Sequence, residues 1–303
     1  MRLVETCCAA AFAALILAGP ASAQTESPQA AQAPTPRART LTRFNNATEV
    51  QLRDIAGFVR VIPENRNDVA IGYVNEGVLP APEYRVSRRR LIVDGKLRRQ
   101  IRSCRVIGGE GFEVQTTRNG RLSGAELPVI ELRVPQNAIV GVSGAVRLHM
   151  GAAQAATIRL GACGDADILR VEDEAEIAVS GSQDVRLYEA GTATISIAGS
   201  GDVTLGAVHD GLTVSVAGAG DVVAARVDGA TSIAVQGSGD VTVRDGHATS
   251  LSVVIAGGGD VTHGGSAESL DVVILGGGDV RVRHVEGEIN RRVLGGGQVL
   301  VGR

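Results

Sequence analysis

Tryptophan is absent from the 303 residues, and there are only four phenylalanines and three tyrosines. Large aromatic side chains fill an ordinary enzyme core, so their scarcity argues against a globular enzyme and favours a narrow core of Val, Ile, Ala and Leu. No apolar run of eighteen residues follows the N-terminal segment, which argues against an integral helical membrane protein. The formal net charge of −3 gives no reason to expect nucleic acid as a partner.

The N-terminal residues have the pattern of an export signal. An apolar run from Cys7 to Gly19 is followed by Ala21-Ser22-Ala23, the small-x-small pattern after which signal peptidase cuts. We therefore expect residues 1–23 to be a signal peptide and the mature protein to be periplasmic, secreted or on the cell surface. The alternative is an uncleaved membrane anchor, for which this apolar run is short. Residues 24–40 contain three prolines and no apolar period, which predicts a disordered linker.

Residues 41–135 contain strand-like segments separated by loops of uneven length. Segments such as Phe58–Ile62 and Ile130–Val134 alternate apolar and polar residues, which is typical of half-buried strands. No helical period stands out after the signal. We expect an irregular N-terminal β region here.

A repeat takes over at residues 136–303, where proline is absent. Its motif is Gly-x-Gly-Asp-Val, with degenerate copies around Asp165 and Asp184 and a last copy that has Gln298 in place of Asp. From Asp165 onward the steps are 19, 18, 19, 19, 20, 19 and 19 residues, which indicates a stack of equivalent units. The last glycine and the aspartate of the five clearest copies are Gly201 and Asp202, Gly220 and Asp221, Gly239 and Asp240, Gly259 and Asp260, and Gly278 and Asp279.

The pattern inside one unit predicts its geometry. Apolar residues stand one and three positions after each aspartate, as at Val203 and Leu205, and seven and five positions before it, as at Ile195 and Ile197. Each unit is then a strand, a tight corner at which glycine supplies unusual backbone angles, a second strand and a variable return loop. Such a unit buries its apolar face only against identical neighbours. The sequence therefore predicts an all-β fold, a parallel β-helix (β-solenoid) of about eight rungs of roughly nineteen residues.

The rungs at Ile195–Val203 and Ile233–Val241 resemble the glycine-rich head (GIN) domain of bacterial autotransporter adhesins. The segments Gly57–Pro63 and Leu132–Pro135 are also similar to that family, so the resemblance covers about residues 41 to 303. It implies a parallel β-helix exported to the cell envelope, with adhesion as the suspected role. No catalytic residue comes with the resemblance.

The repeated aspartates predict a ladder along one edge of the solenoid. Neighbouring carboxylates would stand ~4.8 Å apart, where they repel by ~1 kcal/mol in water. Either they accept hydrogen bonds from turn N–H groups, or cations lie between them. Calcium-binding β-rolls need their motif twice per coil, and here it occurs once. We expect a structural ladder without stoichiometric calcium or another cofactor, so that chelator leaves the melting temperature unchanged.

Two cysteines remain after removal of the signal, Cys104 and Cys163. In an oxidising compartment they could pair in a disulfide, and two buried thiols are the alternative. No local Cys-x-x-Cys motif supports a zinc site.

No catalytic or metal-binding constellation can be read from the repeat. His209 and His247 occupy equivalent positions two rungs apart, ~9.6 Å, which is too far for one metal ion. Ser200 and Ser238 lie in corners that lead into strands, whereas a nucleophile elbow leads into a helix. We therefore expect a non-enzymatic structural or interaction module with an envelope or surface partner. The alternatives are a polysaccharide-active β-helix enzyme and a calcium-binding β-roll.

Basic residues cluster in the N-terminal region. One interpretation is a patch for anionic envelope polymers, and the other is the solvated face of two edge strands, where charge discourages edge pairing. The core of this candidate patch is Arg88, Arg89, Arg90, Arg98 and Arg99.

The last rung departs from the repeat. Arg291 takes an inward position, and Gln298 replaces the aspartate. Terminal repeats commonly differ because they cap the core against water. We expect this rung to block end-to-end growth and the protein to be a monomer or a small homo-oligomer.

Overall fold

A computed structural model describes residues 40–109 and 111–302, which form an all-β fold with 68% of residues in strands. The predicted signal peptide and all but the last residue of the predicted linker lie outside the described residues. Within the described ranges, no helix has the length and apolar character needed to cross a bilayer.

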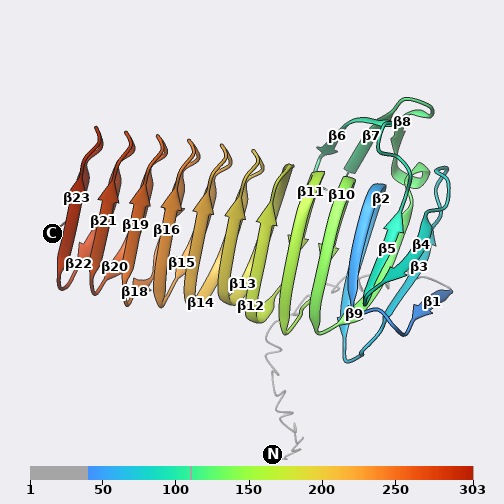
Figure 1. Cartoon of the computed structure of the whole chain (residues 1–303), viewed down its shortest axis with the longest axis horizontal. Helices are drawn as coiled ribbons and strands as arrows, with labels where there is room; N and C mark the ends of the chain where they lie inside the picture. Colours follow the sequence, from blue (N-terminus) through green and yellow to red (C-terminus); the bar gives the residue numbers. More distant parts are fainter. Residues whose placement is uncertain (1–39, 110, 303) are drawn as a thin grey trace, which may run out of the picture. The chain divides into compact units, whose positions relative to one another are not determined.

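The predicted β-solenoid is confirmed, with about nine turns and a spacing near 19 residues. Figure 1 shows the turns side by side, from β10 to the C-terminal rung. The strands of these turns are β10 (Asn137–Met150), β11 (Ala155–Ile168), β12 (Val171–Val179), β13 (Ser182–Ile197), β14 (Val203–Val216), β15 (Val222–Val227), β16 (Ala230–Val235), β17 (Val241–Val243), β18 (His247–Ala248), β19 (Leu251–Ile255), β20 (Val261–Ala267), β21 (Leu270–Ile274), β22 (Val280–Val285), β23 (Ile289–Val293) and β24 (Val299–Val301).

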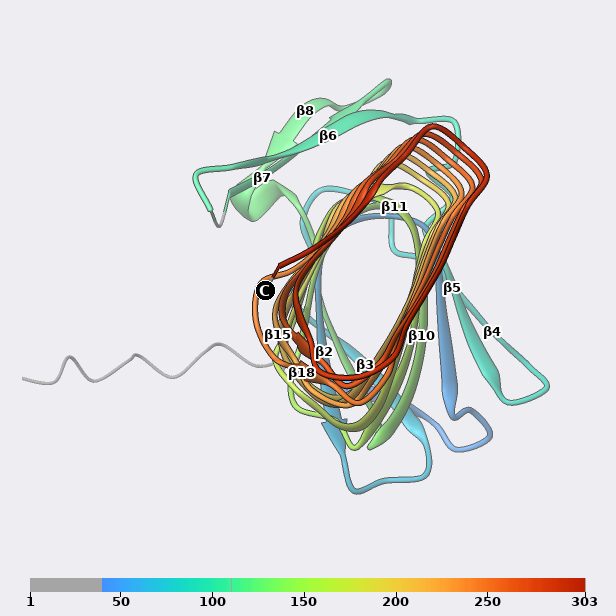
Figure 2. The same ribbon diagram turned by 90° about the vertical axis from the view of Figure 1, so that its left-hand side faces the viewer.

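Equivalent residues of successive turns pair in parallel. Val203 pairs with Val222, and Val222 with Val241, so apolar side chains that alternate along each strand form inward columns along the stack. Figure 2 looks along the stack of turns. Because the columns consist of Val, Ile, Leu and Ala, the core fills without tryptophan and almost without aromatic rings.

The parallel stack crosses residue 135 and includes an N-terminal strand. β2 (Glu49–Glu64) pairs in parallel with β10 on one side. On its other side β2 pairs in parallel with β5 (Arg90–Asp94) and β9 (Val129–Pro135). The earliest solenoid strand in the chain is therefore an interior layer (Figure 1).

Antiparallel strands close the end of the stack beyond β9. β3 (Val69–Asn75) pairs with β9, and β1 (Leu41–Phe44) pairs with β3. β4 (Glu83–Ser87) forms a hairpin with β5. These antiparallel strands belong to the same sheet as the parallel turns and interrupt its parallel pattern at this end.

A small three-stranded sheet, here called the flap, lies on the outside of the first turns (Figure 2). It consists of β6 (Ile101–Ile107), β7 (Gly111–Thr116) and β8 (Gly120–Ser123), followed by a 3-10 turn at Gly124–Glu126. Its inner side chains form a second core against outward residues of the solenoid. The members of this core include Ala56, Phe112, Val114, Leu122 and Ala145.

The Gly-x-Gly corners need glycine because the backbones of successive turns lie very close together there. The expectation that glycine supplies unusual backbone angles there is wrong for the five clearest copies, because none of their glycines is in the left-handed region, whereas Gly164 in the degenerate copy at Asp165 has a φ of 121°. Instead, a Cβ atom on Gly278 would overlap the Gly259 carbonyl oxygen of the preceding turn, and one on Gly276 would overlap the Gly257 oxygen. The middle residue faces open space, since a Cβ on Gly277 would meet nothing within 4 Å. Gly229 and Gly246, which are in the left-handed region, lie at the opposite end of the rung.

The return segment, expected as a loop, is largely strand. β13 and β14 each continue without interruption through the opposite bend of the rung. In later turns that bend becomes a short turn, as between β15 and β16. Pairing along most of the perimeter satisfies the backbone groups that a loop would leave to water.

Candidate functional site

The aspartate ladder is built from hydrogen bonds between successive corners. In each step the carboxylate of one aspartate accepts a hydrogen bond from the backbone nitrogen at the equivalent position of the next turn. The steps run Asp184 to Asp202 (3.0 Å), Asp202 to Asp221 (2.9 Å), Asp221 to Asp240 (2.8 Å), Asp240 to Asp260 (2.8 Å), Asp260 to Asp279 (2.8 Å) and Asp279 to Gln298 (2.9 Å).

One oxygen of each ladder carboxylate is thereby occupied. The Asp279 backbone N–H and the Arg281 guanidinium hold the pKa of Asp260 below its usual range. No group of three His, Cys, Asp or Glu side chains that could hold a metal ion occurs in residues 40–109 and 111–302. The expectation that the ladder is structural and binds no stoichiometric calcium stays a prediction.

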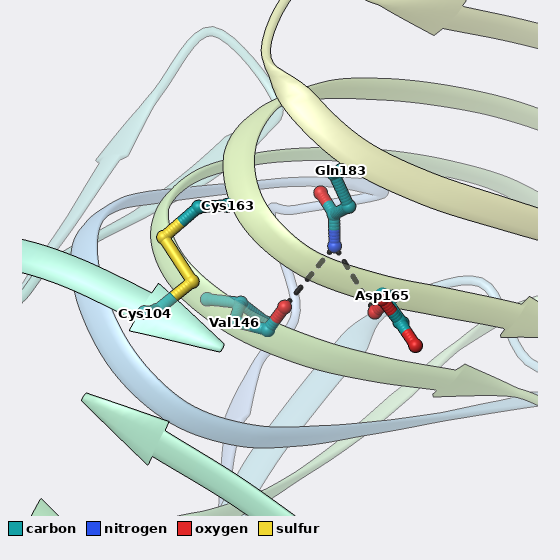
Figure 3. Close-up of a disulfide and its surroundings, with 5 residues drawn as sticks. All are labelled: Cys104, Val146, Cys163, Asp165 and Gln183. Atoms are coloured by element: carbon teal, nitrogen blue, oxygen red, sulfur yellow. Dashed lines mark hydrogen bonds between the residues drawn. A yellow bond between two sulfur atoms is a disulfide. The ribbon is translucent and has the colours of Figure 1, made fainter. Parts of the chain in front are cut away.

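Cys104 and Cys163 are joined by a disulfide that ties β6 of the flap to β11 of the solenoid (Figure 3). Their Cα atoms lie 6.1 Å apart, a usual separation for this bond. Both side chains pack against the second core, beneath the flap. The bond therefore links the flap to the face that it covers.

Gln183 fills the corner beside this disulfide. It stands where later turns have glycine, and its amide nitrogen donates to the carbonyl oxygens of Val146 and Asp165, both at 3.1 Å (Figure 3). One buried side chain thus binds two preceding turns. Glycine stands at this position in the preceding turn, at Gly164, and again in the next turn at Gly201, where a Cβ would overlap the backbone carbonyl oxygen of Gln183.

A hollow of about 610 Å³ opens on the outer face of these turns, beside the flap. Three of its charged residues are neighbours in one outward column, because His149 on β10 pairs with Asp167 on β11, which pairs with Arg186 on β13. Arg147 and the exposed ring of Tyr188 also line the hollow. Cations, a carboxylate and an aromatic ring therefore converge on one concave surface.

The two arginines of this hollow lie close to acidic side chains without forming hydrogen bonds to them. The closest Arg147 and Asp167 atoms are 3.8 Å apart, and Arg186 lies 3.7 Å from Asp165 and 3.5 Å from Asp167. Burial, together with repulsion by Asp184, raises the pKa of Asp165, although Arg186 and Arg147 oppose the shift. Arg147 is only 4% exposed, and its Nε and Nη1 have no hydrogen-bond partner among the described residues.

The sequence interpretation missed this hollow. In the sequence its residues look like ordinary outward-facing ones, because nothing shows that the flap covers part of this face. These residues are Arg147, Asp167, Arg186 and Tyr188. The steps of 18 and 19 residues from His149 to Asp167 and Arg186 match the rung length, and the replacement of a corner glycine by Gln183 marked the place as irregular.

The candidate anion patch is divided in the structure. Arg88 and Arg89 form the exposed turn between β4 and β5, and Arg90 begins β5 with an ion pair to Glu49 at 2.8 Å. Arg98 and Arg99 follow the opposite end of β5. The two groups are thus separated by the length of this strand, and binding of an envelope polymer by them stays a prediction.

The histidines do not assemble into a site within the part of the chain that the structure describes. His209 contacts Glu189, and His247 contacts Ser266 and Glu268. His263 points into the solenoid core, where burial lowers its pKa and neither ring nitrogen has a hydrogen-bond partner in the described chain.

Comparisons with known proteins agree with the GIN resemblance. Residues 208–302 match the family described as "Putative auto-transporter adhesin, head GIN domain". No curated protein matches the sequence.

The fold also occurs in solved structures. A crystal structure described as a putative adhesin from Parabacteroides distasonis aligns with a TM-score of 0.54 and 14% identity, over 86% of this chain and 96% of that one. One described as a putative adhesin from Parabacteroides merdae covers 87% and 96%, with 15% identity and a TM-score of 0.40. One described as a putative lipid binding protein from P. distasonis also covers 87% and 96%, with 13% identity and a TM-score of 0.39. At these identities the first of them shows a shared fold.

Proposed function

We propose that this chain, whose C-terminal turns match the GIN head domain, is an exported, non-enzymatic module of the cell envelope. It holds an extracellular or envelope partner against the outer face of its solenoid, as an adhesin does. Three features support the proposal: the export signal pattern, the family match over residues 208–302, and a disulfide of the kind formed in oxidising compartments.

The observation that carries the proposal is the repetition of outward side chains along the stack. Thr194, Thr213, Ser232 and Ser252 pair in successive turns, so one hydroxyl column runs along a face of the rod. Equivalent groups spaced by one β-strand separation, ~4.8 Å, offer the same hydrogen bonds to each segment of an extended partner. A rigid surface of this kind binds without losing conformational freedom of its own.

Adhesion of the purified chain tests the proposal. The protein, coupled to beads through its N-terminus, is exposed to whole cells and to fractionated envelope polymers, and beads that carry a bovine serum albumin coat are the control. We expect saturable retention on at least one surface or polymer. Retention equal to that of the control beads on all of them, or fractionation of the native protein with the cytoplasm, would contradict the proposal.

One observation favours a second candidate, a polysaccharide-active enzyme. The hollow beside the flap brings Arg147, His149, Asp167 and Arg186 together, and a lyase needs carboxylates and a base in one groove. Arginine stays protonated and is a poor base, and Lys96, the single lysine, pairs with Glu83 and Asp94 outside the hollow. His149 would have to serve as the base. Incubation with acidic polysaccharides distinguishes the two functions, because a lyase releases unsaturated, ultraviolet-absorbing ends and a binding module does not.

A further inference from the structure

Arg147 has hydrogen-bonding capacity that the described protein does not use. Its side chain is only 4% exposed. The Nε and Nη1 donors have no acceptor among the described residues. Buried polar groups are almost always hydrogen-bonded, because an unsatisfied donor loses its water contacts without replacement. Both donor atoms are themselves covered, so the guanidinium lies beneath the floor of the hollow and contributes a buried positive charge there, without an acid that accepts these two hydrogen bonds.

The neighbouring acids do not take that role. Asp167 approaches Arg147 only through Nη2 and at 3.8 Å, which is beyond hydrogen-bond distance. Arg186 lies at a similar distance from Asp165 and Asp167, at 3.7 and 3.5 Å. Arg147 and Arg186 thus interact with Asp165 and Asp167 through charge alone, at distances too long for directional hydrogen bonds.

The apolar part of the hollow limits the class of ligand. Tyr188 is 56% exposed and Leu169 58% exposed, so a phenol ring and an aliphatic side chain form one wall of the hollow. An exposed aromatic ring flanked by charged side chains suits a sugar, whose C–H faces pack on the ring while its hydroxyls bond to the flanking groups. The volume of about 610 Å³ accommodates one or two such rings.

We propose that the hollow binds a carboxylate-bearing sugar unit of an acidic polysaccharide. The sugar carboxylate accepts hydrogen bonds from Arg186 above the buried positive charge of Arg147, Asp167 accepts from sugar hydroxyls, and one ring face packs on Tyr188. Arginine presents paired donors that match a carboxylate. This inference rests on the proposed function and names the class of ligand that one surface of the protein would bind.

The charge balance favours a single carboxylate over a phosphate group. Two arginines face Asp165 and Asp167, and His149 lies 3.6 Å from Asp167, so acidic and basic groups are nearly balanced around the hollow. A dianion would be repelled by both aspartates, whereas a monoanion that also carries hydroxyl donors uses the arginines and Asp167 together. An acidic peptide lacks the sugar's rigid C–H face for Tyr188.

Calorimetric and NMR titration of the full chain tests the assignment. The ligands are trigalacturonate, neutral galactotriose, inorganic phosphate and triglutamate, each up to about 10 mM. We expect saturable binding of trigalacturonate, at least tenfold tighter than that of the other three. No binding of trigalacturonate in this range, or equal binding of galactotriose, overturns the proposal. Binding of phosphate or triglutamate as tight as that of trigalacturonate overturns the saccharide part and leaves a general anion or peptide site.

Variants locate the binding. Tyr188→Ala and Arg186→Gln alter exposed side chains and should each weaken trigalacturonate binding at least tenfold, as should Arg147→Met if it melts like the parent. Arg283→Gln, which removes an exposed charge from β22 far along the stack, is the matched control and should bind like the parent. Unchanged binding by the Tyr188 and Arg186 variants would contradict the site. If beads carrying these variants still adhere to cells, the proposed function survives and the hollow is not its binding surface.

Discussion

The Asp202 carboxylate accepts a hydrogen bond from the backbone nitrogen of Asp221 at 2.9 Å. Because the acceptor belongs to one turn and the donor to the next, this contact fixes the register of the stack at a corner where the strands are interrupted. The same contact recurs from Asp184 to Gln298. The repeated aspartate thus satisfies one backbone N–H of the next turn at each corner.

Removal of one ladder carboxylate should destabilise the solenoid measurably. Asp221→Ala leaves the Asp240 N–H without its acceptor, and we expect a loss of about 1 kcal/mol in the free energy of unfolding, measured in urea. Asp221→Asn retains an oxygen acceptor and should lose less. Asp271→Ala is the control, because Asp271 is exposed on β21 and its carboxylate bonds to no other described residue. An effect of Asp271→Ala equal to that of Asp221→Ala would refute a specific role of the ladder.

Two adjacent glycines should respond oppositely to the same substitution. A Cβ at position 278 would overlap the Gly259 carbonyl oxygen, so Gly278→Ala must push two turns apart, with an expected loss of ~2–3 kcal/mol. Gly277→Ala adds its methyl group where no atom lies within 4 Å and should change stability by less than ~0.5 kcal/mol. Thermal melting of the two variants compares them directly. Equal melting temperatures would show that the corner glycines serve another purpose.

Acidification should destabilise the turns around His263. Burial lowers the pKa of this imidazole below its usual value of 6.5, so the folded state disfavours the protonated form. Unfolding therefore takes up a proton below pH 6.5, and the stability present above that pH declines as the pH falls toward the folded pKa. His263→Val matches Val243 and Val282, its neighbours in the column, and should remove this decline. Urea unfolding at about pH 5 and pH 8, on either side of the ordinary histidine pKa, measures this loss of stability. His284→Val, which changes an exposed histidine, is the control.

Reduction of the disulfide should loosen the flap while the solenoid stays folded. The bond closes a loop of 59 residues, for which chain entropy predicts a contribution of about 4 kcal/mol. The flap core is distinct from the solenoid core, so the far-ultraviolet spectrum should hardly change. Limited proteolysis with and without dithiothreitol should show new cuts between residues 95 and 128. The double variant Cys104→Ser with Cys163→Ser should reproduce the cuts without reductant, and resistance of both forms would show that the bond is dispensable.

Removal of the last turn should promote self-association. Residues 286–303 cover Val272, Ile274 and Val282, which are buried in the parent. Their loss exposes an apolar parallel edge without the arginines of β23, so another sheet can pair with it. Light scattering and size-exclusion chromatography should detect larger species. A truncated protein as monodisperse as the parent would contradict a capping role for this turn.

The sequence predicted the solenoid because the rung repeats an alternation that only stacking can bury. It did not predict the position of β2 between β9 and β10, since the alternating pattern identifies a strand but not its neighbours. The pairing of Cys104 with Cys163 stayed open for a similar reason, because spacing alone does not place two cysteines together. The hollow was missed because Arg147 looks like any outward charge until the flap is in place. The role of the corner glycines was misjudged, since the sequence shows that a side chain is excluded but not whether backbone angle or proximity excludes it.

The interior position of β2 gives assembly of the rod a direction. As the chain is synthesised from its N-terminus, β2 has no parallel partner until β5 and β9 have followed, so we expect residues 49 to 135 to form the first layers of the rod. β10 then adds to the vacant edge of β2, and each later turn adds to the turn before it. Antiparallel strands have by then closed the opposite edge, so elongation proceeds one way only. The chain completes its template before its repeats, and every repeat arrives at an edge already in place.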